Sequence, residues 1–267
     1  MTEPEFVETG TGPAVHVMRV YDHPIERVWR AVTTPEHLEH WFPTAADFDL
    51  RPGGRIRFGD LGDGGSEGEV LAVEPPRRLD FLWGGQRFEF RLVPEGSGTR
   101  FTLVHHFDDR AGAASFASGW ETCLRALSAV LSDEPPPPPG RAVARHEELV
   151  RRFGLDRPLV TRDAAGWHLR FERQLTGPAE RAWSRFFGGD APGVGEPYQR
   201  YGTVTEADAA KTFACPGVRL TLGPGTGHGA RLVLEADGTG EPELAAAVEQ
   251  WGGAVARVAR EVAASEA

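Results

Sequence analysis

The sequence is poor in the residues and segments that mark several classes of protein. Among 267 residues only Cys123 and Cys215 are cysteines, and neither belongs to a CxxC motif, so no disulfide framework is predicted. The opening residues are acidic and polar, without the basic and apolar regions of a signal peptide. No apolar run approaches the length that spans a bilayer. These absences favour a cytoplasmic protein with no membrane partner.

Positive charge is also scarce. Lysine and arginine together number 29 against 39 aspartates and glutamates, which gives a net charge of −10. A chain with this balance repels phosphate backbones and anionic membranes unless it carries a local basic patch. The sequence shows no such patch, so we expect no nucleic-acid partner.

What the sequence does contain is apolar and aromatic residues in regular patterns. The hydrophobic fraction is 40%, with 15 phenylalanines and 7 tryptophans, which supports real cores. Residues 115–131 carry one apolar stripe at helical spacing. The stripe consists of Phe116, Trp120, Cys123, Leu124, Leu127 and Leu131. We interpret this segment as a long helix that lies across a sheet.

Strand-like segments separated by turn residues precede this helix. They are residues 15–21, 55–58, 68–74, 78–83, 87–93 and 100–107. Two helices, residues 24–33 and 36–42, fall between the first two. Phe88 and Phe90 alternate with Arg87 and Glu89, which predicts an antiparallel sheet with one buried and one wet face.

The second half echoes the first. PIERVW at residues 24–29 recurs as PAERAW at residues 178–183, each after a predicted strand, and Trp251 begins a helical stripe spaced like that of Trp120. The second copy is 23 residues shorter between its proline and its tryptophan. We therefore predict a duplication whose second copy is degenerate, with its cavity closed. The expected domains are residues 1–134, a proline-rich linker and helix at 135–157, and residues 158–267.

Four segments in order carry a family resemblance: PIERVWRAVTTPEHLEHWF, GEVLAVEPPRRLDFLW, FRLVPEGSGTRFTLVHHF and GWETCLRAL. Residues 14–132 thereby resemble the Hsp90-ATPase-activator-like branch of the START/Bet v 1-like (SRPBCC) superfamily. The resemblance implies an α+β helix-grip fold, a curved antiparallel sheet around a long C-terminal helix with a cavity between them. The resemblance implies no catalytic triad, because the family does not share one.

Within that fold we expect a ligand between the long helix and the inner sheet face. The candidate lining residues are Trp41, Phe42, Phe58, Trp83, Phe88, Phe90, Leu103, His105, Phe116 and Trp120. His105 is the candidate polar anchor, since it is the one ionisable side chain on its strand face. It is either a hydrogen-bonded core histidine or a group whose charge switches near neutral pH.

Other motifs do not indicate a catalytic or metal site. His37 and His40 share a helix face with glutamates beside them, but catalytic zinc needs three protein ligands and no third is clustered there. The glycine-rich residues 223–229 lack the Gly-Lys-Ser/Thr ending of a phosphate loop, and no GxSxG motif is present. We assign no catalytic residue, metal or cofactor.

The function expected first is binding of a small hydrophobic molecule, for sensing, sequestration or resistance. The alternative is an enzyme, a cyclase or hydrolase, acting on a hydrophobic metabolite in the same cavity. A co-chaperone of the Hsp90 type ranks below both, because no separate chaperone-docking domain is visible in the sequence. Pairing with a second copy as a homodimer is left open.

Overall fold

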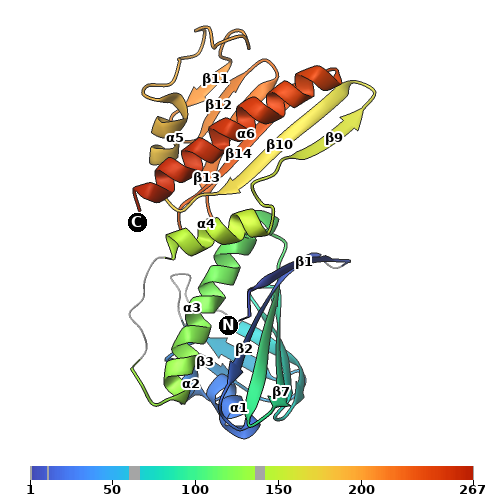
Figure 1. Cartoon of the computed structure of the whole chain (residues 1–267), viewed down its shortest axis with the longest axis vertical. Coiled ribbons are helices and arrows are strands. Elements are labelled where there is room, and N and C mark those ends of the chain that lie inside the picture. The colour runs from blue at the N-terminus through green and yellow to red at the C-terminus, as the bar shows by residue number, and fades with distance from the viewer. Residues whose placement is uncertain (1, 11, 60–66, 136–141, 267) are drawn as a thin grey trace. The chain divides into compact units, whose positions relative to one another are not determined.

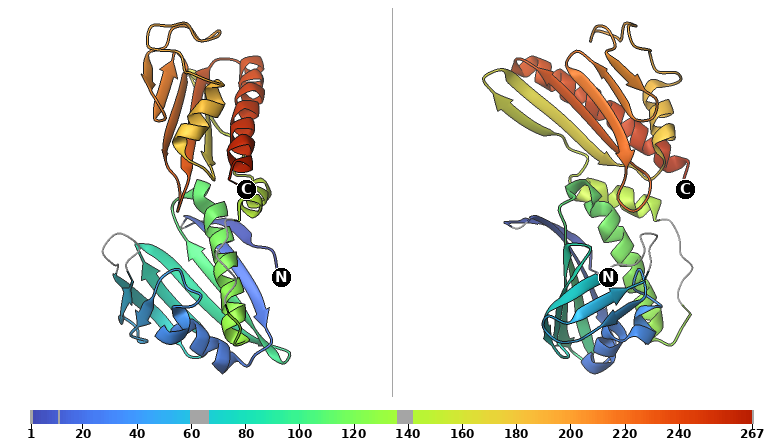
Figure 2. Two further views of the ribbon diagram at one scale, coloured as in Figure 1. Left: turned by 90° about the vertical axis from the view of Figure 1, so that its left-hand side faces the viewer. Right: turned by 180° about the vertical axis from the view of Figure 1, so that it is seen from behind.

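A computed structural model describes residues 2–10, 12–59, 67–135 and 142–266 (Figure 1). The chain divides into two compact units, unit 1 at Met1–Gly140 and unit 2 at Arg141–Ala267. Of the five prolines predicted to form a spacer, Pro135 is described and the other four lie outside the described residues. Each unit is a sheet with one long helix along one face (Figure 2).

Unit 1 is built on an eight-stranded antiparallel sheet with the order β1-β2-β8-β7-β6-β5-β4-β3. Its strands are β1 Glu5–Thr9, β2 Gly12–Tyr21, β3 Ala46–Phe48, β4 Arg55–Phe58, β5 Glu67–Glu74, β6 Arg78–Trp83, β7 Gln86–Glu95 and β8 Gly98–His106. Its helices are α1 Ile25–Thr33, α2 Pro35–Leu38 and α3 Ala113–Leu131, with a 3₁₀ turn at Arg110–Gly112.

The long helix α3 packs its apolar stripe on the inner face of this sheet. Trp120, Leu124 and Leu127 are buried. The end of β2 is fastened to the same helix, since the Tyr21 hydroxyl donates a hydrogen bond to the carbonyl oxygen of Leu124 at 3.2 Å. This arrangement is the predicted α+β helix-grip fold, and the prediction is confirmed.

The strand register explains which side chains face the helix. Phe88 on β7 lies opposite His105 on β8, and Phe90 lies opposite Leu103, and all four are buried. Because successive side chains point to opposite faces, the intervening charged residues of β7 lie on the outer face. The alternation predicted for this strand is observed.

Some elements of unit 1 differ from the sequence prediction. The second helix ends at Leu38 rather than continuing to Phe42, because the chain turns there and the Trp41 indole nitrogen donates to the Ala31 carbonyl at 2.9 Å. The short edge strands β1 and β3 were not predicted. With five and three residues they carry too little alternation to be recognised.

Unit 2 is built on a six-stranded antiparallel sheet with the order β11-β12-β13-β14-β10-β9. Its strands are β9 Leu159–Asp163, β10 Gly166–Gln174, β11 Glu206–Asp208, β12 Thr212–Cys215, β13 Val218–Pro224 and β14 Ala230–Gly238. Its helices are α4 Val143–Arg152, α5 Ala179–Phe187 and α6 Glu241–Ala264.

The two sheets share one strand order. The series β1-β2-β8-β7-β6-β5 in unit 1 has the counterpart β9-β10-β14-β13-β12-β11 in unit 2, and α1 and α3 correspond in chain order to α5 and α6. The described part of unit 2 has no counterpart of α2, β3 and β4. Tyr198 and Val204, from the segment between α5 and β11, enter the core instead. This order is what the duplication hypothesis requires, and common descent stays a prediction.

The outer face of the unit 1 sheet holds a buried carboxylate. The Asp80 side chain is 1% exposed, and Arg78 and Arg87 lie 2.9 and 3.2 Å from its Oδ2 while Arg91 contacts Oδ1. Burial by itself raises the pKa of Asp80, but hydrogen bonds and charge from Arg78 and Arg91 outweigh it and hold the pKa below the usual range. Asp80 is therefore charged and joins β6 to β7.

Asp80→Asn is expected to lower the free energy of unfolding at pH 7 by about 1–3 kcal/mol, because charge-assisted hydrogen bonds to partly exposed guanidinium groups are lost. The folded-state pKa lies below the unfolded value of about 3.9, so this stabilisation is present above that value and is lost as pH falls through the folded pKa. Urea unfolding at pH 7 and at pH 3 measures both effects.

The matched control is Asp47→Asn, which breaks an exposed pair with Arg57 whose side chains are 51% and 74% exposed. This change should stay within about 0.5 kcal/mol. Equal losses for the two variants would contradict the structural role of Asp80.

Candidate functional site

The ten predicted lining residues come together in unit 1. Eight of them are buried, and the remaining two, Trp83 and Phe116, are half-buried. Ring centroids of Trp83 and Phe58 are 4.7 Å apart, and those of Trp83 and Phe42 are 5.3 Å apart. We call this set the aromatic cluster, and the side at which half-buried Trp83 lies is its half-buried edge.

His105 lies inside the aromatic cluster and uses both ring nitrogens. The Trp120 indole nitrogen donates to His105 Nδ1 at 3.1 Å, so the other nitrogen, Nε2, carries the proton and donates to Gln86 Oε1 at 2.5 Å. The imidazole stacks on Phe88 with centroids 4.2 Å apart. Trp120 and Gln86 therefore fix the neutral tautomer that carries its proton on Nε2, and Phe88 packs against the face of the ring.

This environment decides between the two interpretations of His105. Burial, with a smaller contribution from neighbouring His106, lowers the pKa of His105 to about 3. Protonating Nδ1 also breaks its hydrogen bond with Trp120. The expectation of a charge that switches near neutral pH is therefore wrong, and His105 is a hydrogen-bonded core histidine.

Gln86 is the polar residue that sequence reasoning missed. The Gly84-Gly85 turn pairs Trp83 with Gln86, so Gln86 lies at the first position of β7 and on the same face as Phe88. It is half-buried, next to the half-buried Trp83. Counting alternate residues back from Phe88 across this turn would have found it.

His37 on α2 and His40 just after it have separate neighbours. His37 Nδ1 is 2.7 Å from the Thr34 hydroxyl, and His40 lies beside exposed Glu39. Among the described residues, no group of three metal-ligating side chains is present.

A hollow of about 330 Å³ opens beside Phe58, between the start of α2 and strands β3 and β4.

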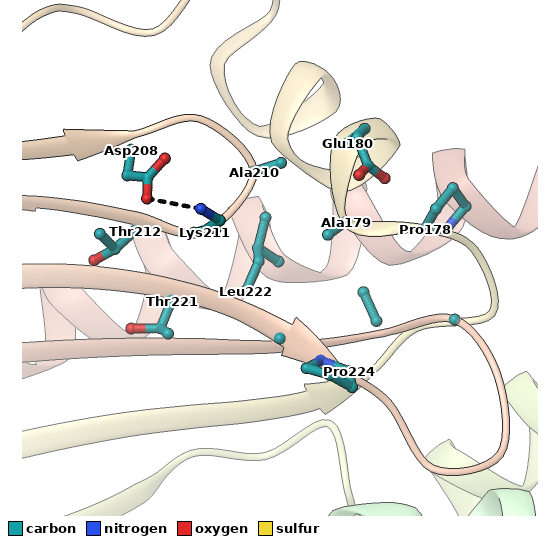
Figure 3. Close-up of a pocket in the computed structure, with 13 residues that line it drawn as sticks. Pro178, Ala179, Glu180, Asp208, Ala210, Lys211, Thr212, Thr221, Leu222 and Pro224 are labelled. Carbon is teal, nitrogen blue, oxygen red and sulfur yellow. Dashed lines mark hydrogen bonds and ion pairs between the residues drawn. The ribbon is translucent and has the colours of Figure 1, made fainter.

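A larger hollow, of about 630 Å³, lies in unit 2 (Figure 3). The start of α5, the β11–β12 turn and the adjoining ends of β13 and β14 line it. Lys211, the single lysine of the chain, pairs there with Asp208 at 3.2 Å, and Leu222 forms part of the apolar lining. The sequence patterns gave no indication of this hollow, because it is formed by a turn and strand ends.

No helix among the described residues is long and apolar enough to cross a membrane.

Comparison with known proteins supports the assignment of unit 1. The sequence pattern of the family described as "Activator of Hsp90 ATPase homolog 1-like protein" matches residues 22–132. No curated protein sequence matches the chain.

Solved structures resemble part of the chain. EF2215 from Enterococcus faecalis, a conserved protein of unknown function, has 17% identity and a TM-score of 0.50, over 57% of this chain and 90% of its own. CalU16 from Micromonospora echinospora has 27% identity and a TM-score of 0.44, over 57% and 93%. The Aha1 dimer from Colwellia psychrerythraea has 20% identity and a TM-score of 0.39, over 44% and 95%.

The helix-grip fold of unit 1 and the match over residues 22–132 lead to one conclusion. Residues 22–132 of unit 1 are similar to the Aha1-like branch of the START/Bet v 1-like (SRPBCC) superfamily, and the helix-grip fold of the unit agrees with that similarity.

Proposed function

We propose that unit 1 binds a small, largely apolar molecule at the half-buried edge of the aromatic cluster. The observation that carries the proposal is the hydrogen-bonded series Trp120–His105–Gln86, which runs from the core to that edge within otherwise apolar surroundings. Small-molecule sites are mostly apolar and contain a few well-placed polar groups. The similarity of residues 22–132 to this family favours a ligand-binding role as well.

The polar anchor in this proposal is Gln86. Its Oε1 is engaged by His105, which fixes the orientation of the amide and leaves the Nε2 hydrogens as donors beside Trp83. The ring of Trp83 supplies apolar contact area. The ligand class that fits is an aromatic or polycyclic molecule with a carbonyl or hydroxyl oxygen.

Binding is favoured over catalysis by the state of His105. A general base must accept a proton near the working pH, whereas both nitrogens of His105 are engaged and its pKa is about 3. The buried carboxylate of Asp80 lies on the opposite sheet face, so it does not serve the cluster. A cyclase or hydrolase would need another base. The co-chaperone alternative rests on the family description alone.

Trp83→Ala is expected to weaken binding of the neutral apolar dye Nile red by about 10- to 100-fold, because one large aromatic surface is removed from the site. Fluorescence titration of the whole chain measures the affinity, and melting temperatures establish that the variant folds. Native mass spectrometry of protein purified from its own host would identify a co-purifying metabolite.

Leu71→Ala serves as the control, since Leu71 is a 38% exposed apolar residue on β5 and not part of the cluster. Its dye affinity should equal that of the wild type. If Trp83→Ala and Leu71→Ala bind the dye equally well, the proposed site is wrong.

The low pKa of His105 predicts a pH dependence of stability. The unfolded chain takes up this proton near pH 6.5, while the folded chain does so near pH 3, so stability attributable to His105 falls as pH drops between these values. The slope reaches at most about 1.4 kcal/mol per pH unit. His105→Gln, which retains an acceptor for Trp120, should flatten it.

Urea unfolding from pH 7 to pH 4 measures this pH dependence. His40→Gln is the control variant, because it removes an exposed histidine in the same way. An unchanged slope in His105→Gln would mean that folded His105 accepts a proton near neutral pH. That result would favour the enzyme alternative over simple binding.

A further inference from the structure

The strand register places one residue of unit 2 at the position of His105. In unit 1, His105 lies opposite Phe88 on the neighbouring strand β7. In unit 2, Ala236 on β14 lies opposite Val218 on β13, and these strands correspond to β8 and β7 in the shared strand order. Ala236 therefore replaces the imidazole with a methyl group.

The tryptophan that bonds His105 is retained in unit 2 without its partner. Trp120 follows His105 by 15 positions, and Trp251 on α6 follows Ala236 by the same number. Trp251 is 2% exposed, and its indole Nε1 has no hydrogen-bond partner among the described residues. A buried N–H without an acceptor costs free energy, so a hydrogen-bond acceptor at this position would stabilise the structure.

The surroundings of Trp251 have also been reduced in size. Phe116, eleven positions after His105, is replaced by Ala247, eleven positions after Ala236. Trp167 packs against the strand position of Gly238, since a Cβ at Gly238 would lie 2.3 Å from its ring. The other side of Trp251 is covered by half-buried Tyr201, with ring centroids 5.3 Å apart.

We propose that unit 2 has a ligand site of its own, centred on the Trp251 indole N–H beside Ala236. The molecule that fits is small and apolar and carries one oxygen acceptor, such as a ketone or ether, which accepts the indole hydrogen bond. Tyr201 lies on the solvent side of this site, and its hydroxyl donates to Gln250 Oε1 at 2.9 Å. The proposal does not depend on ligand binding in unit 1.

The test follows the indole N–H signals of the seven tryptophans by NMR in the full chain labelled with ¹⁵N-tryptophan. Trp251→Phe identifies the signal of Trp251. Acetophenone, which has one carbonyl acceptor, should shift this signal downfield in a saturable manner. Ethylbenzene, which has a similar shape and no acceptor, should leave it in place. The signal of Trp29, a buried tryptophan on α1 that is not part of the aromatic cluster, is the internal control.

Ala236→His supplies a protein acceptor and fills the space, so it should abolish the response to acetophenone. If this variant fails to fold, the comparison of the two probes on the wild-type chain still decides the matter. No saturable shift of Trp251, or an equal shift with ethylbenzene, would overturn the proposal. A cross-peak from the Trp251 indole proton to bound water that persists with acetophenone would also overturn it, because water would then be the acceptor.

Discussion

The hydrogen bond from Trp120 to His105 is the interaction on which the interior of unit 1 depends. A tryptophan on the covering helix brings a large ring into the core together with an N–H that needs an acceptor. His105 supplies that acceptor and donates a hydrogen bond from its Nε2–H to Gln86 Oε1, so helix α3, strand β8 and strand β7 are held in one arrangement. A one-residue shift of β8 would turn His105 outward and break this series.

Much of this fold follows from local patterns. Strands β4 and β6 occupy the predicted residues, because their alternating side chains mark one buried face. The common face of Phe88, Phe90, Leu103 and His105 was predicted for the same reason, whereas helical spacing placed Phe116 and Trp120. Burial of Asp80 could not be predicted, since alternation places it on the wet face and only the long arginine side chains of neighbouring positions cover it. The pKa of His105 likewise depends on partners from other elements, which a sequence does not locate.

The two units have the same order of six strands but different side chains in their interiors. Unit 1 fills its core with stacked rings and satisfies its indole donor within the chain. Unit 2 replaces His105 with Ala236 and Phe116 with Ala247, and a segment carrying Tyr198 takes the place of a helix and two strands. Backbone pairing is preserved because it depends on alternation, whereas side-chain volume is free to vary.

The described part of unit 2 has no counterpart of β3 and β4, and this difference has a consequence for self-association. An exposed sheet edge offers unpaired backbone groups to other chains, and a long edge invites aggregation. The sheet of unit 2 ends in β11 and that of unit 1 ends in β3, and both strands have only three residues. At this end each sheet therefore presents one brief edge strand, which leaves little backbone there for a neighbouring molecule to extend.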